Sequence, residues 1–214
     1  MCGIVAYIGS QQAYPIILEG LKRLEYRGYD SAGISVLNGD IKTVKRKGKV
    51  SKLESAAKDK DVSGNIGIGH TRWATHGKPD DINAHPHLSG NGRLALIHNG
   101  IIENYSTLKK ALADIGHEFK SETDTEVLVH LVEEYQKREN LSLSEAVRRA
   151  LEKAIGAYAI VVIDKENPDV IVGARKSSPL VLGLGDDEYF LASDASPIIK
   201  YTNKVVYLND EEIV

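Results

Sequence analysis

Cys2 is the residue of this 214-residue chain best placed to act as a nucleophile, because it is the single cysteine and directly follows the initiator Met1. An initiator methionine is commonly removed before a residue as small as cysteine. Its removal would put a thiol and a free α-amine on one residue. An α-amine has a reference pKa of about 7.7–8.0, so it can accept the thiol proton near neutral pH. The alternative is a buried, unreactive cysteine, but the position favours a nucleophile.

A second group of reactive side chains lies in residues 69–77, which read Gly-His-Thr-Arg-Trp-Ala-Thr-His-Gly after an apolar run. Such a density of polar and aromatic residues is typical of a loop that binds a small polar molecule. Arg72 offers a planar guanidinium that matches a carboxylate. The alternative is a surface loop in which Arg72 makes a salt bridge at the rim and Trp73 fills the core.

The pair Asn99-Gly100 ends the apolar run 94–98. Asn-Gly is a common turn sequence, which is the simpler interpretation. The other interpretation is an oxyanion hole, in which the Asn99 side-chain amide and the next backbone N–H point at one position.

Asp124 lies near the start of a predicted amphipathic helix. Asp is common as a helix cap, and the pairs Ser121 with Asp124 and Thr123 with Glu126 have capping-box spacing. The same carboxylate could instead bind the ammonium group of a ligand.

Four histidines are candidate metal ligands: His70, His76, His85 and His87. Their spacing matches neither a zinc finger nor a zinc protease, and a single cysteine provides no cysteine pair. Phosphate-binding and dinucleotide-binding glycine motifs are also missing from the sequence. We therefore expect no metal and no cofactor.

Two kinds of element must position these residues. Strand-like runs rich in Ile, Val and Tyr occupy residues 4–8, 32–37, 41–46, 66–70, 94–98, 158–163, 170–174, 180–184, 189–192 and 205–208. Helical periodicity appears at residues 16–24, 108–115, 127–132 and 143–151. Because strands gather at both ends with most helices between them, the pattern favours an α+β fold with two antiparallel sheets and outer helices.

The composition is that of an ordinary globular domain, with 42% hydrophobic residues, 27% charged residues and a net charge of -3. This balance gives no reason to expect nucleic acid or a membrane as a partner. No apolar stretch approaches the roughly 20 residues of a membrane helix. The N-terminus has no basic signal-peptide region, and one cysteine permits no internal disulfide, so we expect a cytoplasmic protein.

Taken together, these segments resemble a known family. The start Cys-Gly-Ile-Val resembles the class II, or N-terminal nucleophile (Ntn), glutamine amidotransferases. Five further segments look like the glucosamine-6-phosphate synthase family within that class: residues 23–33 (RLEYRGYDSAG), 69–77 (GHTRWATHG), 83–87 (NAHPH), 98–104 (HNGIIEN) and 121–126 (SETDTE).

The resemblance implies an Ntn-hydrolase fold, a four-layer αββα sandwich, and hydrolysis of L-glutamine to L-glutamate and ammonia through a thioester on Cys2. It implies that Asn99 and Gly100 hold the oxyanion, that Arg72 binds the substrate carboxylate and that Asp124 binds its ammonium group. It further implies that Trp73 is a gate for ammonia. The segment that closes over the ligand would consist of Thr75, His76 and Gly77.

The resemblance also implies a missing partner. Residues 1–214 correspond to the glutaminase domain, and the isomerase half that would use the ammonia to convert fructose 6-phosphate to glucosamine 6-phosphate is absent. We expect the full-length enzyme to be a homodimer, whereas the isolated domain is compatible with a monomer. Two alternatives stay open: the glutaminase domain of another class II amidotransferase, such as amidophosphoribosyltransferase, and a non-catalytic glutamine-binding module.

Overall fold

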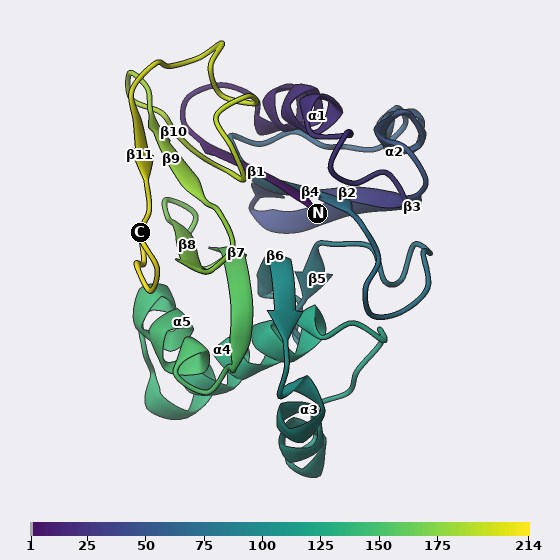
Figure 1. The fold of residues 1–214 in the computed structure, drawn as a ribbon, viewed down its shortest axis with the longest axis vertical. Helices are drawn as coiled ribbons and strands as arrows, with labels where there is room; N and C mark the ends of the chain where they lie inside the picture. The colour runs from purple at the N-terminus through teal and green to yellow at the C-terminus, as the bar shows by residue number, and fades with distance from the viewer. Residues whose placement is uncertain (1) are drawn as a thin grey trace.

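The computed structural model describes residues 2–214 and contains two antiparallel sheets stacked face to face, with helices outside them (Figure 1). The larger sheet has the order β11-β9-β10-β1-β4-β2-β3. Its strands are β1 (Gly3–Ile8), β2 (Ser31–Asn38), β3 (Asp40–Lys47), β4 (Ile66–Arg72), β9 (Val181–Leu184), β10 (Tyr189–Ala192) and β11 (Val205–Tyr207). The smaller sheet has the order β5-β6-β7-β8, with β5 (His87–Leu88), β6 (Leu94–Ile102), β7 (Gly156–Asp164) and β8 (Ile171–Lys176).

Five helices complete the sandwich. The pair α1 (Ala13–Arg23) and α2 (Val50–Ala57) covers the larger sheet, and their apolar faces form one core with its outer side. The helices α3 (Tyr105–Asp114), α4 (Thr125–Glu139) and α5 (Leu143–Leu151) pack on the smaller sheet in a second core. The order helix, sheet, sheet, helix confirms the predicted αββα arrangement (Figure 1).

The central strands are apolar on both faces because each face is buried against a different layer. In β1, Ile4 and Ala6 point into the core between the sheets, whereas Val5 and Tyr7 point toward the helices. Successive side chains of a strand alternate between the two faces, so one short strand contributes to two cores. Burying each large aliphatic side chain stabilises the fold by roughly 1.5–3 kcal/mol.

β1 lies inside the larger sheet, where it pairs with β10 on one side and β4 on the other. Gly3 pairs with Thr71, and the Ile4 N–H donates to Ser193 Oγ at 2.7 Å. Because Cys2 precedes this paired strand directly, its position is defined by two neighbouring strands. The sheet therefore holds the candidate nucleophile at a fixed place.

The predicted elements are confirmed with small shifts, and each of the ten predicted strands and four predicted helices has a counterpart. The short strand β5 and the helix α2 were not predicted. The capping-box prediction is wrong: Asp124 does not cap α4 with its side chain. The Glu126 carboxylate accepts instead from the backbone N–H groups of Lys120 and Ser121, at 2.8 and 2.6 Å.

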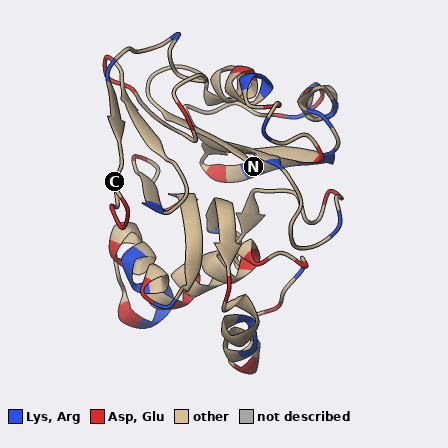
Figure 2. Ribbon diagram, viewed as in Figure 1, with Lys and Arg blue, Asp and Glu red and all other residues tan. Residues whose placement is uncertain are grey.

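Charged side chains lie mainly on the helices, the connections and the edge strand β3, with both signs interspersed, while the strands inside the two sheets are largely uncharged (Figure 2). On α5, for example, Arg148 forms ion pairs with Glu145 and Glu152. Within residues 2–214, no helix is both long enough and apolar enough to cross a lipid bilayer.

Candidate active site

The Cys2 thiol lies beside the start of the loop that follows β4. The Trp73 N–H donates to Cys2 Sγ at 3.2 Å, and Sγ lies 3.5 Å from the Trp73 carbonyl oxygen. Burial raises the pKa of the thiol above its ordinary value, against the opposing effect of the Trp73 N–H. The thiol therefore needs a base nearby to become a thiolate. The predicted removal of Met1, which would supply that base, lies outside the described residues.

A small pocket opens beside this thiol. Its walls come from both sheets and from the start of α4, and they are formed by Cys2, Arg72, Trp73, Thr75, His85, His98, Gly100, Thr123, Asp124 and Thr125. Six of the nine predicted site residues are in this wall. Most of these walls are polar or charged side chains, so the pocket suits a polar molecule.

Arg72 is buried at the end of β4 and is held by backbone carbonyls. Its guanidinium donates to the carbonyl oxygens of His76, Gly77 and Lys78, the last two at 3.0 and 3.4 Å. Among residues 2–214, its hydrogen bonds go to this loop, so the alternative interpretation of Arg72 as a salt bridge at the rim is wrong. His76 and Gly77 thus act through their backbone, and further N–H groups of the guanidinium are left for a carboxylate.

Asp30 holds the same loop from the other side. Its carboxylate accepts from the Ala74 N–H, and its own N–H donates to the Arg72 carbonyl oxygen at 3.2 Å. Trp73 is half exposed and its ring lies edge-on to Tyr29, with 5.6 Å between ring centroids. Asp30 had been noticed in the sequence only as part of a family segment, because a contact across 44 residues leaves no local pattern.

Asn99 lies within β6, so the interpretation of Asn99-Gly100 as a turn is wrong. The Asn99 side chain donates through Nδ2 to the Cys2 carbonyl oxygen and to Ser193 Oγ, each at 3.0 Å. Its Oδ1 lies 2.9 Å from His70 Nε2. These three contacts place the amide directly beside the candidate nucleophile. Ser193 was missed in the sequence, where nothing marks a lone serine that follows a strand.

Gly100 faces the pocket in a conformation that requires glycine. Its φ is +129°, and a Cβ at this position would lie 2.0 Å from the Ala157 carbonyl oxygen on β7. A side chain here would disrupt the pairing of β6 with β7. Glycine is therefore required where β6 passes β7 beside the pocket.

Asp124 is buried at the far side of the pocket, just before α4. Its Oδ2 accepts from the Ile102 N–H at 2.8 Å, a bond that orients the carboxylate across 22 residues of sequence. Because Arg72 and Asp124 line the same pocket, it carries one cationic and one anionic group. This pair can recognise a molecule with a carboxylate and an ammonium group.

Four buried histidines support the pocket from below: His70, His85, His87 and His98. Burial lowers the pKa of each, to about 3 for His70, so all four are neutral near pH 7. The rings of His70 and His85 stack with centroids 4.1 Å apart, and the His98 N–H donates to His85 Nδ1 at 3.2 Å. These side chains act as hydrogen-bonding scaffold in the structure.

A second hollow also borders Cys2. It shares Cys2, Trp73, Thr75 and Gly100 with the first pocket, and its further walls are Arg27, Asn99, Ile101, Ser178 and Pro179. The thiol thus borders both a small polar pocket and a larger, more apolar hollow.

A family model described as the glutamine amidotransferase domain matches residues 55–213. The chain belongs to this family. It is 60% identical over 215 residues to a glutamine–fructose-6-phosphate aminotransferase (isomerizing) of Bacteroides thetaiotaomicron, and 55% identical over 215 residues to one of Thermus thermophilus. Each alignment covers the whole chain but 35% of the relative, so the chain spans about a third of the length of these curated relatives.

The amidotransferase fold is also found among solved structures. The glutamine phosphoribosylpyrophosphate amidotransferase of B. subtilis matches with a TM-score of 0.81 and 29% identity, over all of this chain and 48% of its own. A glutamine aminotransferase class-II domain protein from Silicibacter pomeroyi matches in fold, with a TM-score of 0.60 and 19% identity over 99% of this chain and 93% of its own. The predicted Ntn-hydrolase class is thereby confirmed.

Proposed function

We propose that this chain hydrolyses L-glutamine to L-glutamate and ammonia, with Cys2 as its N-terminal nucleophile after removal of Met1. The observation that carries the proposal is one pocket that contains the Cys2 thiol, the Arg72 guanidinium, the Asp124 carboxylate and the Gly100 backbone. Free glutamine has a carboxylate, an ammonium group and a side-chain amide. Each of these groups has a chemically matched partner in the pocket.

Binding uses the two charged residues. Arg72 takes the α-carboxylate of glutamine through guanidinium N–H groups, while His76 and Gly77 hold Arg72 in place and Thr75 lines the entrance. Asp124 takes the α-ammonium group. A substrate lacking either group would leave a buried charge unpaired, which costs a few kcal/mol and explains a preference for the free amino acid.

Chemistry then proceeds in two stages. The α-amine of Cys2 takes the thiol proton, and the thiolate attacks the side-chain amide carbon of glutamine. The tetrahedral oxyanion accepts hydrogen bonds from Asn99 Nδ2 and the Gly100 N–H, so Asn99 exchanges one of its present acceptors for the oxyanion. The carbon–nitrogen bond breaks, and the ammonium form of the α-amine returns the proton to the leaving group, which departs as ammonia. Water then attacks the thioester, releases glutamate and restores the thiol.

For the whole protein, we propose the activity that the relatives' name describes. Residues 1–214 would be its glutaminase domain, and an isomerase domain would use the ammonia to convert fructose 6-phosphate to glucosamine 6-phosphate. Ammonia would pass Trp73, which borders both hollows beside Cys2. A homodimer and a cytoplasmic location belong to the same proposal. Higher identity to these relatives than to the phosphoribosylpyrophosphate amidotransferase favours it over that alternative.

The test is glutamate release from L-glutamine, measured together with the intact mass of the chain. We expect a mass without Met1, glutamate production by the wild type and a loss of roughly 10⁴-fold or more in Cys2→Ala. The 214-residue chain alone is expected to form no glucosamine 6-phosphate. Glutamine binding without turnover, in protein that has lost Met1, would favour the non-catalytic binding module instead. Trp73, the single tryptophan, reports binding by fluorescence because it lines the pocket.

A further inference from the structure

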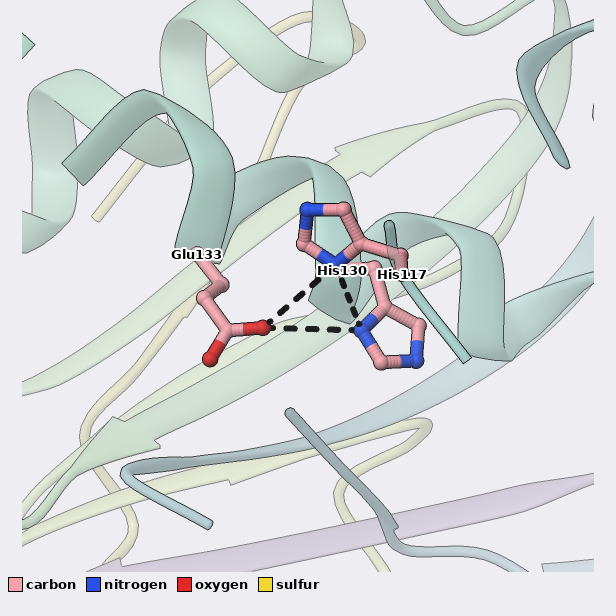
Figure 3. A group of neighbouring side chains, drawn as sticks. All are labelled: His117, His130 and Glu133. Carbon is pink, nitrogen blue, oxygen red and sulfur yellow. Dashed lines mark hydrogen bonds and ion pairs between the residues drawn. The ribbon is translucent and has the colours of Figure 1, made fainter. Parts of the chain in front are cut away.

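A second group of histidines lies away from the glutamine pocket, where the segment after α3 meets α4. His117 comes from this segment, and His130 and Glu133 are one turn apart on α4. Figure 3 shows that His117 Nδ1, His130 Nδ1 and Glu133 Oε2 point toward one another. The two ring nitrogens are 3.2 Å apart, and they lie 3.7 Å (His117) and 3.5 Å (His130) from the carboxylate oxygen.

These three distances match the edges of a metal coordination tetrahedron. Zinc binds histidine nitrogen and carboxylate oxygen at about 2.0–2.2 Å, which makes adjacent ligand atoms roughly 3.3–3.6 Å apart in a tetrahedral site. The observed edges of 3.2, 3.5 and 3.7 Å need shifts of no more than a few tenths of an ångström. The three atoms thus form one face of a tetrahedron before any ion arrives.

The groups around these ligands are those that support metal-binding histidines. His117 Nε2 lies 2.9 Å from Glu134 Oε2, and His130 Nε2 lies 3.6 Å from Glu126 Oε1. Each ring therefore has its inner nitrogen toward the shared centre and its other nitrogen on the side of a carboxylate. For His117 this contact is a hydrogen bond, which fixes the ring orientation and makes the inner nitrogen a stronger ligand, whereas His130 Nε2 is within ion-pair distance of Glu126 without a hydrogen bond.

Glu133 is also held in place, because its carboxylate accepts from the Gly90 and Asn91 N–H groups, each at 3.0 Å. These amides belong to the turn between β5 and β6. Three separate segments of the chain thus meet at one point: this turn, the segment after α3, and α4.

Solvent reaches the group through a surface hollow whose walls include His117, Glu133 and Glu134. His130 lies behind them and is almost fully buried. An ion can enter from this side, and a water molecule can complete the fourth position.

We propose that His117, His130 and Glu133 form a binding site for a divalent transition-metal ion, with zinc as the best match. Two imidazole nitrogens, one carboxylate and one open position are a known zinc ligand set, whereas calcium and magnesium prefer oxygen ligands. When no metal is bound, a ring N–H can bridge the two Nδ1 atoms, and metal binding displaces that proton. A bound ion would tie the segment around His117 to α4, the helix that follows Asp124.

Equilibrium binding tests this site. The chain, free of affinity tags, is dialysed against a chelator and titrated with zinc in competition with a chromophoric chelator. We expect one equivalent per chain that survives dialysis, and a tetrahedral absorption spectrum when cobalt(II) replaces zinc. The Cys2→Ser variant should retain the site, because the thiol is not a ligand, and His76→Asn should retain it as a matched histidine control.

Two variants remove one ligand each, His117→Asn at a partly exposed position and Glu133→Gln at a nearly isosteric one. Loss of the bound zinc and of the cobalt(II) absorption spectrum in either variant, with an unchanged circular dichroism spectrum, supports the proposal. Zinc binding that is equal in the wild type and both variants overturns it, as does a wild type that retains no zinc. If His117→Asn alters the fold, the result with Glu133→Gln decides.

Discussion

The two groups of histidines differ in what surrounds them. His70 and His85, under the glutamine pocket, are stacked on one another in an interior where burial lowers their pKa values. For His130, on α4, burial also lowers the pKa, but the carboxylates of Glu126 and Glu133 raise it more, so its pKa lies above the ordinary value. The same residue type is thus a neutral scaffold in one place and part of an ionic cluster in the other.

This difference shows that burial alone does not decide what a histidine does. Without a carboxylate, a buried imidazole stays neutral and exchanges hydrogen bonds, as His70 does with Asn99 and the His98 carbonyl oxygen. With carboxylates on two sides, the imidazole is stabilised in its charged form, and the same environment favours a metal ion. The neighbours, rather than the histidines, separate a scaffold from a candidate metal site.

The largest expected effect is a change in the stability of the fold at acidic pH, to which the two groups of histidines contribute with opposite sign. A histidine whose pKa is lowered in the folded state binds a proton more readily when unfolded, so stability is lost as pH falls below about 6.5. Each of the four neutral histidines contributes up to about 1.4 kcal/mol per pH unit. His130 has a raised pKa and acts in the opposite sense, with stability present below about 6.5 and lost as pH rises through its folded pKa.

We therefore expect the free energy of unfolding to fall by roughly 3–5 kcal/mol between about pH 7.5 and pH 5.5. Urea unfolding at the two pH values, in the presence of chelator, measures this change. His117→Asn serves as the control and should show a similar decline. A stability that is level across this range would mean that the four interior histidines become protonated without unfolding the chain.

The next effect concerns the pocket that the neutral histidines support. Asp124→Asn removes the charge that would bind the glutamine ammonium group but keeps an oxygen for the Ile102 N–H. We expect kcat/KM to fall by about 100-fold, mainly through KM, because the ammonium group loses its ionic partner. Steady-state kinetics of glutamate release measure this, and His117→Asn should stay within about twofold of the wild type. A decrease below about threefold would remove Asp124 from the proposed binding site.

A smaller effect tests how Asn99 is positioned. Ser193→Ala removes the oxygen that accepts from Asn99 Nδ2 and from the Ile4 N–H. Loss of an oxyanion donor costs roughly 10²–10³ in rate, so a misplaced donor should lower kcat by about 10-fold with little change in KM. The split between kcat and KM separates this from a general loss of stability, and the exposed Ser55→Ala is the control. Equal changes in kcat for both variants would contradict a positioning role for Ser193.

The smallest effect is expected in the group formed by His117, His130 and Glu133. In chelator, His117→Asn should lower the free energy of unfolding by about 1 kcal/mol, because its ring is partly exposed and loses its hydrogen bonds to Glu134 and His130. His70→Asn, at a fully buried ring with two hydrogen bonds, should cost about 2–3 kcal/mol. Urea unfolding compares the two variants. Equal losses of stability in the two variants would mean that His117 contributes as much to the core as His70.

Much of the architecture could be predicted from the sequence. The strand runs were found because their apolar residues are bounded by Gly, Asn, Asp and Pro, and the helices because their apolar residues recur every three or four positions. The strand β5 was missed because two residues carry no alternation. The helix α2 was missed because its buried residues, Val50, Leu53 and Ala57, form a weak apolar stripe.

Several predicted site residues were brought together as expected, but their individual roles in the structure differ from the local interpretations. For Asp124 the local pattern favoured a helix cap, but its side chain makes no capping bond to α4 and accepts from the Ile102 N–H instead. Arg72 was equally consistent with a salt bridge, and the carbonyls of residues 76–78 hold it instead. Residues next to one another in the sequence cannot distinguish these alternatives, because the hydrogen-bond partners that decide between them lie elsewhere in the chain.

The sequence by itself determined which chain segments form strands and helices, that a lone thiol stands next to the chain start, and which family the motifs resemble. These properties depend on residue type and local spacing. Only the tertiary structure decided that Asn99 contacts Cys2 across 97 residues, and that His117 meets His130 and Glu133 beside the turn at Gly90 and Asn91. The physical reason is that burial and hydrogen bonding between distant segments arise only when both sheets and their helices have packed together.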